Sequence, residues 1–220
     1  LVSYFETKLM RVWYPTTVGT ISLQAYKIIQ EFLEETGDVA GIPWKLHDFG
    51  DRGTSSVESA MIGGGAHLFN FRGSDTFIAN EYLFQYYGAD MPSDSIPATQ
   101  HSTMTILGPE GEYKQILNFL NKFAANKIKA CVLDSYNIYK AIQFIGTQKE
   151  LFEKQQSMFV ARPDSGDPVK MSLECVERLD IEFGHTVNAK GYKVLNTVRV
   201  IYGDGIDSPA VIRKILQNLK

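Results

Sequence analysis

Polar and glycine residues gather in six short clusters along this sequence, and each cluster follows directly on a short apolar run. The clusters occupy residues 47–53, 72–75, 101–103, 134–136, 162–166 and 203–207. Their histidine, aspartate, arginine and glycine residues are types that bind phosphates, sugar hydroxyls and flat polar rings. Ligands of parallel α/β folds bind beyond the carboxyl ends of the strands, so six such ends predict one shared site. For any single cluster a simpler interpretation is open, because polar residues also form the turns that follow strands.

The elements that would position these clusters alternate along the chain between helix and strand. Apolar residues three and four apart predict helices at 1–35, 56–67, 77–87, 113–123, 136–145, 169–179 and 210–219. We expect Pro15 to break the first helix into two pieces, and the glycines at 63–65 to allow close backbone packing. Short apolar runs predict strands at 44–47, 68–71, 128–133, 158–161 and 198–202, with an extended stretch at 95–99 and a loop at 184–196.

This alternation is typical of a mostly parallel α/β sheet, and we expect a single domain over residues 1–220. Six strand–helix units are too few to close an eight-stranded barrel. The expected fold is therefore an irregular (β/α) barrel-type domain that is incomplete in this chain. The sequence also opens without a methionine, inside a helical pattern, so we expect it to be the central part of a longer protein.

The composition argues against several classes of protein. With 22 Lys and Arg against 25 Asp and Glu, the net charge of −3 argues against a general nucleic-acid binder. No apolar run approaches the ~18 residues of a membrane helix, and the first residues lack the pattern of a secretion signal. Cys131 and Cys175 have no metal-binding spacing, which indicates two reduced core thiols in a cytoplasmic protein without a structural zinc site.

Taken in order, the clusters resemble those of the nicotinamide phosphoribosyltransferase family. The resemblance rests on Lys-Leu-His-Asp-Phe-Gly at 45–50 with Arg-Gly at 52–53, Phe-Arg-Gly-Ser-Asp-Thr at 71–76, Gln-His-Ser-Thr at 100–103, Asp-Ser-Tyr at 134–136, Arg-Pro-Asp-Ser-Gly at 162–166 and Gly-Asp-Gly at 203–205. It covers essentially the whole chain. It implies a type II phosphoribosyltransferase with an irregular α/β barrel, a smaller accessory domain and an active site at a homodimer interface. The family's N-terminal region and C-terminal glycine-rich phosphate loop have no counterpart in these residues.

The resemblance also implies the reaction. Nicotinamide attacks C1 of phosphoribosyl pyrophosphate through its pyridine nitrogen, giving nicotinamide mononucleotide and pyrophosphate. Mg²⁺ accompanies phosphoribosyl pyrophosphate, and ATP hydrolysis is coupled to the synthesis. Such a reaction needs a slot for a flat ring, cations and backbone amides for the phosphates, and carboxylates for the ribose hydroxyls.

Four residues are expected to bind the base and the phosphates. By resemblance, Phe49 stacks on one face of the nicotinamide ring, Arg162 contacts the carboxamide beside a phosphate, and Arg52 contacts a phosphate. Asp75 is expected to select the base, because its carboxylate can accept a bond from an amide but repels the carboxylate of nicotinate. Two like charges about 4 Å apart cost on the order of 4 kcal/mol at an effective dielectric constant of about 20. The residue types alone also fit a core phenylalanine, a surface arginine, an ion pair of Arg162 with Asp164, and a helix-capping Asp75.

Further strand ends supply the expected catalytic groups. His101 resembles the family histidine that is phosphorylated during ATP hydrolysis, and imidazole is a competent nucleophile near neutral pH. Asp134 and Asp164 are expected to be catalytic, and Asp204 to bind substrate. By resemblance these three carboxylates hold ribose hydroxyls, pyrophosphate-bound Mg²⁺ or the base. Without the resemblance, a structural histidine and helix-capping aspartates fit as well.

Gly203 and Gly205 are expected to let the backbone approach a phosphate closely. The sequence departs from the commonest family pattern at two positions. Asp51 stands where a tyrosine is usual, and an acid beside a phosphate site is expected to weaken substrate affinity. Gln100 stands where a glutamate often precedes the histidine, which changes the surroundings of His101 and so bears on the coupling to ATP.

Three other functions compete with this interpretation. The nearest is a nicotinate phosphoribosyltransferase, against which Asp75 argues. A second is a catalytically silent fragment that binds a nucleotide or only contributes an interface. A third is an unrelated (β/α) barrel such as an aldolase, which the absence of a lysine suited to Schiff-base chemistry at any expected strand end disfavours.

Overall fold

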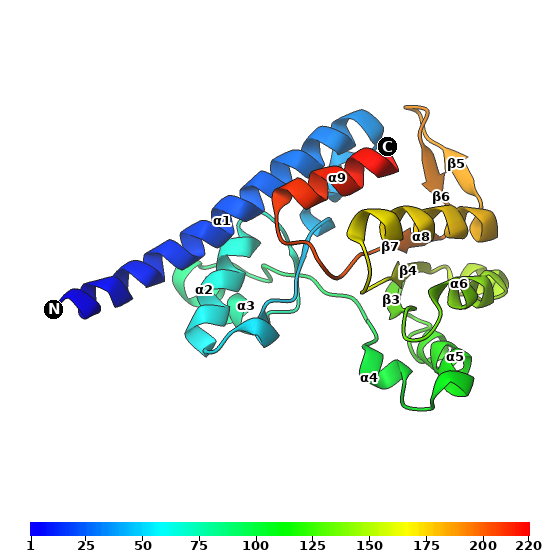
Figure 1. Ribbon diagram of the computed structural model, residues 1–220, viewed down its shortest axis with the longest axis horizontal. Helices are drawn as coiled ribbons and strands as arrows, with labels where there is room; N and C mark the ends of the chain where they lie inside the picture. The colour runs from blue at the N-terminus through cyan, green and yellow to red at the C-terminus, as the bar shows by residue number, and fades with distance from the viewer. The chain divides into compact units, whose positions relative to one another are not determined.

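A computed structural model describes all 220 residues, as two compact units. The first unit comprises residues 1–95 and 208–213, and the second comprises residues 96–207 and 214–220. Residues 208–213 and 214–220 both include parts of helix α9 (Pro209–Leu219), which is drawn in red in Figure 1. None of the helices is both long enough and apolar enough to cross a lipid bilayer. The single domain expected from the sequence remains a prediction, and the two units are described separately.

The first unit is built on one long helix, α1 (Val2–Thr36), which runs through Pro15 without interruption. The predicted break was therefore wrong. A proline removes one backbone bond from a helix, here the one to the Arg11 carbonyl. The helix nevertheless packs along α2 (Val57–Leu68), and this tertiary packing stabilises it as one continuous element. The buried positions of α1 recur at helical spacing in its second half, at Ser22, Ala25, Ile29 and Phe32.

Three consecutive glycines let α2 pack closely on two neighbouring helices, as predicted. A Cβ atom on Gly63 would lie 2.5 Å from the Tyr14 hydroxyl of α1, and one on Gly65 would lie 2.7 Å from the Tyr82 ring of α3 (Phe77–Tyr87). A Cβ atom on Gly64 would lie 2.8 Å from Ala79, also on α3. Any side chain at these positions would push the helices apart. Ser56 caps the start of this helix, because its hydroxyl accepts from the Ser59 amide.

The strands of the first unit are very short. β1 (His47–Asp48) and β2 (Gly73–Ser74) form one parallel pair, with 3₁₀ turns η1 (Val39–Trp44) before β1 and η2 (Asp51–Gly53) after it. The strand predicted at 68–71 was wrong, because α2 continues to Leu68 and the Phe71 amide bonds back to the His67 carbonyl. The apolar side chain at position 71 is explained by burial rather than by a strand. Phe71 is buried and stacks on His67, with ring centroids 5.3 Å apart.

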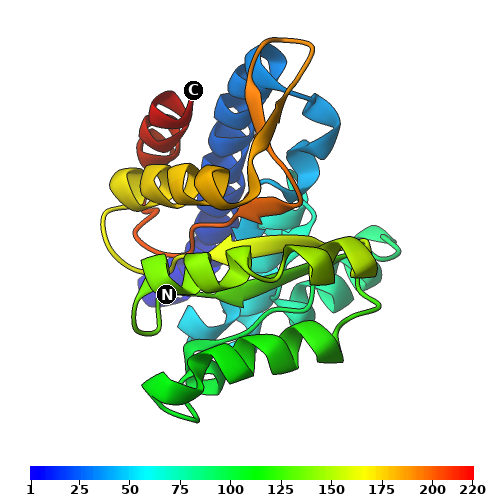
Figure 2. The same ribbon diagram turned by 90° about the vertical axis from the view of Figure 1, so that its right-hand side faces the viewer.

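A three-stranded parallel sheet organises the second unit, in the order β3 (Ile128–Val132), β4 (Met158–Arg162), β7 (Val198–Val200). Figure 2 shows these strands side by side. Ala98 forms a parallel bridge to Ala130, so the segment before His101 runs along the free edge of β3. The mixed α/β class with parallel strands is confirmed, and the described strands do not close into a barrel.

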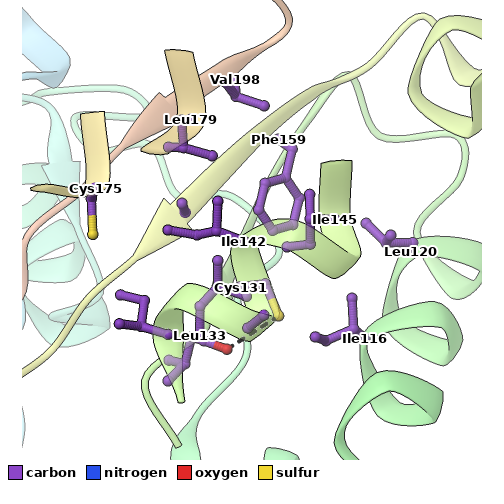
Figure 3. Close-up of a cluster of buried hydrophobic side chains, with 14 of the residues drawn as sticks. Ile116, Leu120, Cys131, Leu133, Ile142, Ile145, Phe159, Cys175, Leu179 and Val198 are labelled. Carbon is purple, nitrogen blue, oxygen red and sulfur yellow. Dashed lines mark hydrogen bonds between the residues drawn. The ribbon is translucent and has the colours of Figure 1, made fainter. Parts of the chain in front are cut away.

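Helices cover this sheet and enclose the core of the second unit (Figure 3). They are α4 (His101–Met104), α5 (Glu112–Lys122) after the turn η3 (Pro109–Gly111), α6 (Ile138–Gly146), α7 (Lys149–Gln155) and α8 (Pro168–Phe183). Ile116, Ile142 and Leu179 are among the buried residues that pack against strand residues such as Phe159. Cys131 and Cys175 are buried free thiols, as predicted, and burial raises the pKa of each to about 12.

The loop predicted at 184–196 is an antiparallel hairpin of β5 (His185–Val187) and β6 (Lys193–Leu195). Its turn is closed by Gly191, at φ +84°, and by a bond from the Asn188 amide to the Tyr192 carbonyl. No strand residue of this hairpin is fully buried. Each strand is also only three residues long, too short to show the polar–apolar alternation that marks a half-buried strand. The hairpin was not predicted for this reason.

Candidate active site

Four neighbouring segments of the second unit end at the same edge of its sheet, and each carries a predicted site residue. Asp134 follows β3, Asp164 follows β4, Gly203 follows β7, and His101 follows the segment bridged to β3. Parallel strands place their carboxyl ends at one edge, so the topology alone brings these residues near one another. His101 opens helix α4, whose start is stabilised by bonds between the Thr103 hydroxyl and the backbone of Gln100. The Gln100 amide donates to that hydroxyl at 3.3 Å, and the hydroxyl donates to the Gln100 carbonyl at 2.7 Å.

An exposed imidazole lies beside two largely buried carboxylates. Nε2 of His101 is 2.9 Å from Oδ1 of Asp134, and Nδ1 is 3.8 Å from Oδ2 of Asp164. The His101 side chain is 45% exposed, whereas those of Asp134 and Asp164 are 6% and 13% exposed. The ring is thus held from one side by fixed acceptors, while its other side remains accessible from solvent.

The carboxylate of Asp134 bonds to three different residues of this cluster. Its Oδ2 accepts from the Asp164 amide at 2.8 Å and from the Ser165 hydroxyl at 2.6 Å, in addition to the Oδ1 contact with His101. Burial by itself raises the pKa of Asp134, but the bonds from Ser165, the Asp164 amide and His101 outweigh burial, so the net effect lowers its pKa. Asp134 is therefore a persistent anion that orients the imidazole and joins the loops after β3 and β4.

Arg162 and Asp164 form a forked ion pair at the end of β4. Arg162 Nη2 lies 3.1 and 3.2 Å from the two carboxylate oxygens of Asp164, and the arginine as a whole is only 7% exposed. A Cβ atom on Gly203 would collide with Asp164 Oδ1 and lie 3.1 Å from Arg162 Nε. The glycine after β7 thus makes room for this pair. The ion pair of Arg162 with Asp164 that the residue types suggested is present. The contact of Arg162 with the substrate remains a prediction.

Tyr202 ties together the loops after β7 and β4. Its hydroxyl donates to the Gly166 carbonyl at 2.7 Å. Burial, followed by the nearby charges of four aspartates including Asp204, raises the pKa of Tyr202, so the phenol keeps its proton. Asp204 and Gly205 themselves are exposed.

The first unit holds a second group of predicted residues at the ends of β1 and β2. The rings of His47 and Phe49 are 4.5 Å apart and inclined by 34°. His47 Nε2 lies 3.1 Å from Asp75 Oδ1, an ion-pair distance, although the ring nitrogen is buried and its N–H does not point at a hydrogen-bond acceptor. The N-cap of α3 is Thr76 rather than Asp75. Arg52, on η2, is exposed.

Asp48 lies at the centre of this second group. Its Oδ1 accepts from the Gly50 amide at 2.9 Å, and its Oδ2 accepts from the Thr76 hydroxyl at 2.6 Å and the Ser74 hydroxyl at 3.4 Å. Its backbone carbonyl accepts from the Asp75 amide at 2.9 Å. One residue therefore links the loop that carries Phe49 to the loop that carries Asp75.

Comparison with known proteins shows the family of the chain. Residues 44–220 match the model of the nicotinate phosphoribosyltransferase (NAPRTase) family. The chain belongs to the NAPRTase family. It is 49% identical over 99% of its length to a nicotinamide phosphoribosyltransferase of Xanthomonas campestris pv. campestris, and 35% identical over 100% of its length to one of Mycoplasma pneumoniae. It covers 47% and 50% of those relatives, so the chain spans about half the length of the curated relatives it matches.

Two separate groups of predicted residues are thus placed in this NAPRTase chain. Phe49 and Asp75 lie together in the first unit, while the second unit joins its site residues at one sheet edge: His101, Asp134, Arg162, Asp164 and Gly203. The convergence of both groups on one pocket, and the roles assigned to each residue, remain predictions.

Several residues that organise this NAPRTase site had no role in the sequence argument. Ser165 and Asp48 lie within the motifs, but a serine or an aspartate in a sequence does not reveal which residue it bonds to. Ser165 donates to Asp134, and Thr76 donates to Asp48, which lies 28 positions away in the sequence. Glu112, at the start of α5, is only 4% exposed, and burial followed by the charge of Asp134 raises its pKa. No local sequence signal distinguishes Glu112 from a surface glutamate.

The described residues contain no group of three or more His, Cys, Asp or Glu side chains arranged to hold a metal ion. The aspartates at the strand ends are instead engaged by backbone, hydroxyl and guanidinium donors. The side chains of this chain therefore do not by themselves fit a resident Mg²⁺.

Proposed function

We propose that the full-length protein is a nicotinamide phosphoribosyltransferase of NAD salvage. A bond forms between the pyridine nitrogen of nicotinamide and C1 of phosphoribosyl pyrophosphate, and the bond from C1 to the pyrophosphate oxygen breaks. The observation that carries this proposal is the group of His101, Asp134, Asp164 and Arg162 at one sheet edge, in a chain of this family. The relatives named above, each a nicotinamide phosphoribosyltransferase by name, support the choice of base.

The geometry around His101 supports its proposed phosphorylation by ATP. With Nε2 donating to Asp134, the neutral imidazole carries its lone pair on Nδ1, which makes Nδ1 the nucleophile toward the terminal phosphorus of ATP. A nitrogen–phosphorus bond then forms as the bond to ADP breaks. Asp134 stabilises the imidazolium character that develops on the ring. Asp164 stays neutralised by Arg162, which limits repulsion of the incoming phosphate.

Base selection is proposed to depend on Asp75 and to be modulated by His47. The Asp75 carboxylate, which accepts a hydrogen bond from the Ser95 hydroxyl at 2.5 Å, is proposed to repel nicotinate, as argued above. His47 lies 3.1 Å from that carboxylate, so a protonated His47 would cancel part of its charge. This contact favours the second candidate, a nicotinate phosphoribosyltransferase.

The deciding experiment uses the full-length enzyme with phosphoribosyl pyrophosphate and Mg²⁺, where Mg²⁺ enters bound to the substrate's phosphates. Product from nicotinamide and from nicotinate is measured by mass spectrometry, with and without ATP. We expect nicotinamide mononucleotide as the main product and a higher yield with ATP. Preference for nicotinate, or selectivity unaltered in an Asp75→Ser variant, would contradict the proposal.

The remaining features of the family are proposed for the full-length protein alone. We infer an irregular barrel completed by chain outside residues 1–220, a cytoplasmic homodimer, and an active site at its interface. The isolated 220-residue chain is expected to show little or no turnover, as a silent fragment would. Light scattering measures the oligomeric state, and a crystal structure with nicotinamide mononucleotide tests whether Phe49, Arg52, Asp75, Arg162 and Asp204 meet the product.

A further inference from the structure

The first unit contains a carboxylate that the proposed reaction does not use but that joins two loops carrying substrate contacts. Asp48 is flanked by His47 and Phe49, and its two carboxylate oxygens accept from the loop at Gly50 and from the loop at Ser74 and Thr76. Phe49 and Asp75 are therefore each adjacent in sequence to a member of one hydrogen-bond network. The Thr76 end of this network is fully buried, because Thr76 is 1% exposed.

Besides these bonds, the two loops are linked by the 3.1 Å contact of His47 Nε2 with Asp75 Oδ1 and by a short strand pair. β1 and β2 are two residues long, so the parallel ladder pairs only His47 with Gly73 and Asp48 with Ser74. Beyond the ladder, the amide of Asp75 bonds to the carbonyl of Asp48. Bonds to a charged acceptor are about twice as strong as neutral ones and are more strongly directed. The Asp48 carboxylate thus supplies much of the restraint that a longer strand pair would supply elsewhere.

We propose that Asp48 is a positioning residue that sets the separation of Phe49 and Asp75 and thereby the selectivity of the enzyme for nicotinamide over nicotinate. This inference rests on the proposed function. Selectivity from like-charge repulsion depends on distance, so a looser Asp75 loop discriminates less. Positioning a ring between a stacking face and a polar contact likewise requires both loops to be held within about 0.5 Å. Asp48 itself does not touch the base in this account.

Two neighbouring variants separate the hydrogen bond from the packing of Thr76. Thr76→Val keeps both branches at Cβ but removes the hydroxyl that donates to Asp48, whereas Thr76→Ser keeps the hydroxyl and removes the methyl group that lies against Gly64. Asp48→Asn removes the charge of the acceptor. Asp38→Asn is the matched control, because Asp38 Oδ1 accepts from the Ala40 amide two residues on, at the same 2.9 Å as the Asp48–Gly50 bond.

The measurement is kcat and KM of the full-length enzyme for each base. In Asp48→Asn we expect the KM for nicotinamide to rise about tenfold, the ratio of kcat/KM for nicotinamide to that for nicotinate to fall about as far, and kcat to change less. In Thr76→Val we expect the KM for nicotinamide to rise and the kcat/KM ratio of nicotinamide to nicotinate to fall, as in Asp48→Asn. Thr76→Ser and Asp38→Asn are expected to keep the wild-type ratio. A purely structural role of Asp48 would lower the thermal stability of Asp48→Asn and Thr76→Val without changing the ratio of kcat/KM values for the two bases.

The outcomes are distinguishable. If Thr76→Val and Asp48→Asn both keep the wild-type base ratio, the inference is wrong and the proposed function stands. If Asp48→Asn does not fold, the contrast between Thr76→Val and Thr76→Ser decides alone, and equal ratios in those two overturn the inference. A wild-type enzyme that transfers to neither base overturns the proposed function and the inference with it.

Discussion

The two units hold their predicted site residues by different means. In the second unit, β3 and β4 pair over five residues, and the side chains beyond them are joined by a network of charged groups that is mostly buried. In the first unit, β1 and β2 pair over only two residues, and side-chain bonds to Asp48 take the place of a longer ladder. The second unit therefore fixes its site mainly through backbone topology, and the first unit depends more on side-chain bonds, those to Asp48 among them.

This difference predicts where each unit is vulnerable. A ladder of several backbone bonds tolerates the loss of any one side chain at its surface, whereas a crowded charged network does not tolerate added volume or a lost acceptor. The largest effects are thus expected at the strand ends of the second unit. Smaller effects are expected away from that edge and in the helices of the first unit.

Gly203→Ala is the substitution with the largest expected effect. The new Cβ atom would collide with the Asp164 carboxylate, so the pair with Arg162 must move. We expect kcat/KM of the full-length enzyme to fall more than ~100-fold, because misplacement by ~1 Å has effects of this size, and the unfolding free energy to fall by about 1–3 kcal/mol. Gly41→Ala is the control, since its Cβ atom meets only the end of Lys45 at 3.5 Å. Near-normal activity in Gly203→Ala would show that the Arg162–Asp164 geometry is dispensable.

Asp134→Asn tests whether the charged network, rather than the strand ladder, orients His101. The amide cannot accept from Ser165, the Asp164 backbone and His101 together, and its NH₂ group faces at least one donor. We expect activity to fall about 10- to 100-fold and stability to fall by about 1–3 kcal/mol. Asp180→Asn breaks another Asp–His contact of the same unit, the 2.6 Å bond to His185 on the hairpin, and is expected to leave turnover unchanged. Equal losses in both variants would argue against a special role for Asp134.

Lys129→Met probes the amino end of the same sheet, where no predicted site residue lies. Lys129 is fully buried on β3, and its ammonium donates to the Phe123 carbonyl at 3.0 Å and to the Gln155 side chain at 2.7 Å. Methionine fills the space but leaves both oxygens without this donor, so we expect about 1–3 kcal/mol of lost stability, measured by urea unfolding. Turnover well below the melting temperature should stay normal. Lys127→Met, at an exposed position two residues earlier, is the control.

The contrast between the units also explains which features the sequence could predict. Helices with a buried stripe, such as α5 and α8, and fully buried strands such as β3 and β4 agree with the sequence pattern to within a few residues. The continuity of α1 through Pro15 was not predictable in this way, because it depends on tertiary packing against α2. The helix α4 that carries His101 is one turn long, too short for any periodicity to reveal.

At the site, residue types were predictable but partners were not. The order of the motifs placed His101, Asp134 and Asp164 at strand ends, and the parallel topology then brought them together. The bond between Asp48 and Thr76 joins residues 28 positions apart, and nothing local in either segment specifies it. The room that Gly203 leaves for Asp164 is likewise a property of packing, since the sequence suggested only a close approach to phosphate.

His67 gives the smallest expected effect and reports on the first unit alone. Burial is the main reason that the pKa of His67 is lowered below its usual value of 6.5; its Nε2 lies 3.0 Å from the Gly73 carbonyl. As the pH falls, His67 of the unfolded chain therefore takes up a proton at a higher pH than His67 of the folded chain does. The stability linked to this neutral imidazole is fully present above pH ~6.5 and is lost progressively as the pH falls below that value.

Hydrogen exchange of the α2 amides, which lie in the first unit, should accelerate a few-fold between pH 7 and pH 5 after correction for the intrinsic pH dependence of exchange. His67→Gln should remove most of that acceleration and His185→Gln, in the other unit, should not. An α2 exchange profile that is equally pH-dependent with and without His67 would mean that other groups govern the acid sensitivity of the first unit.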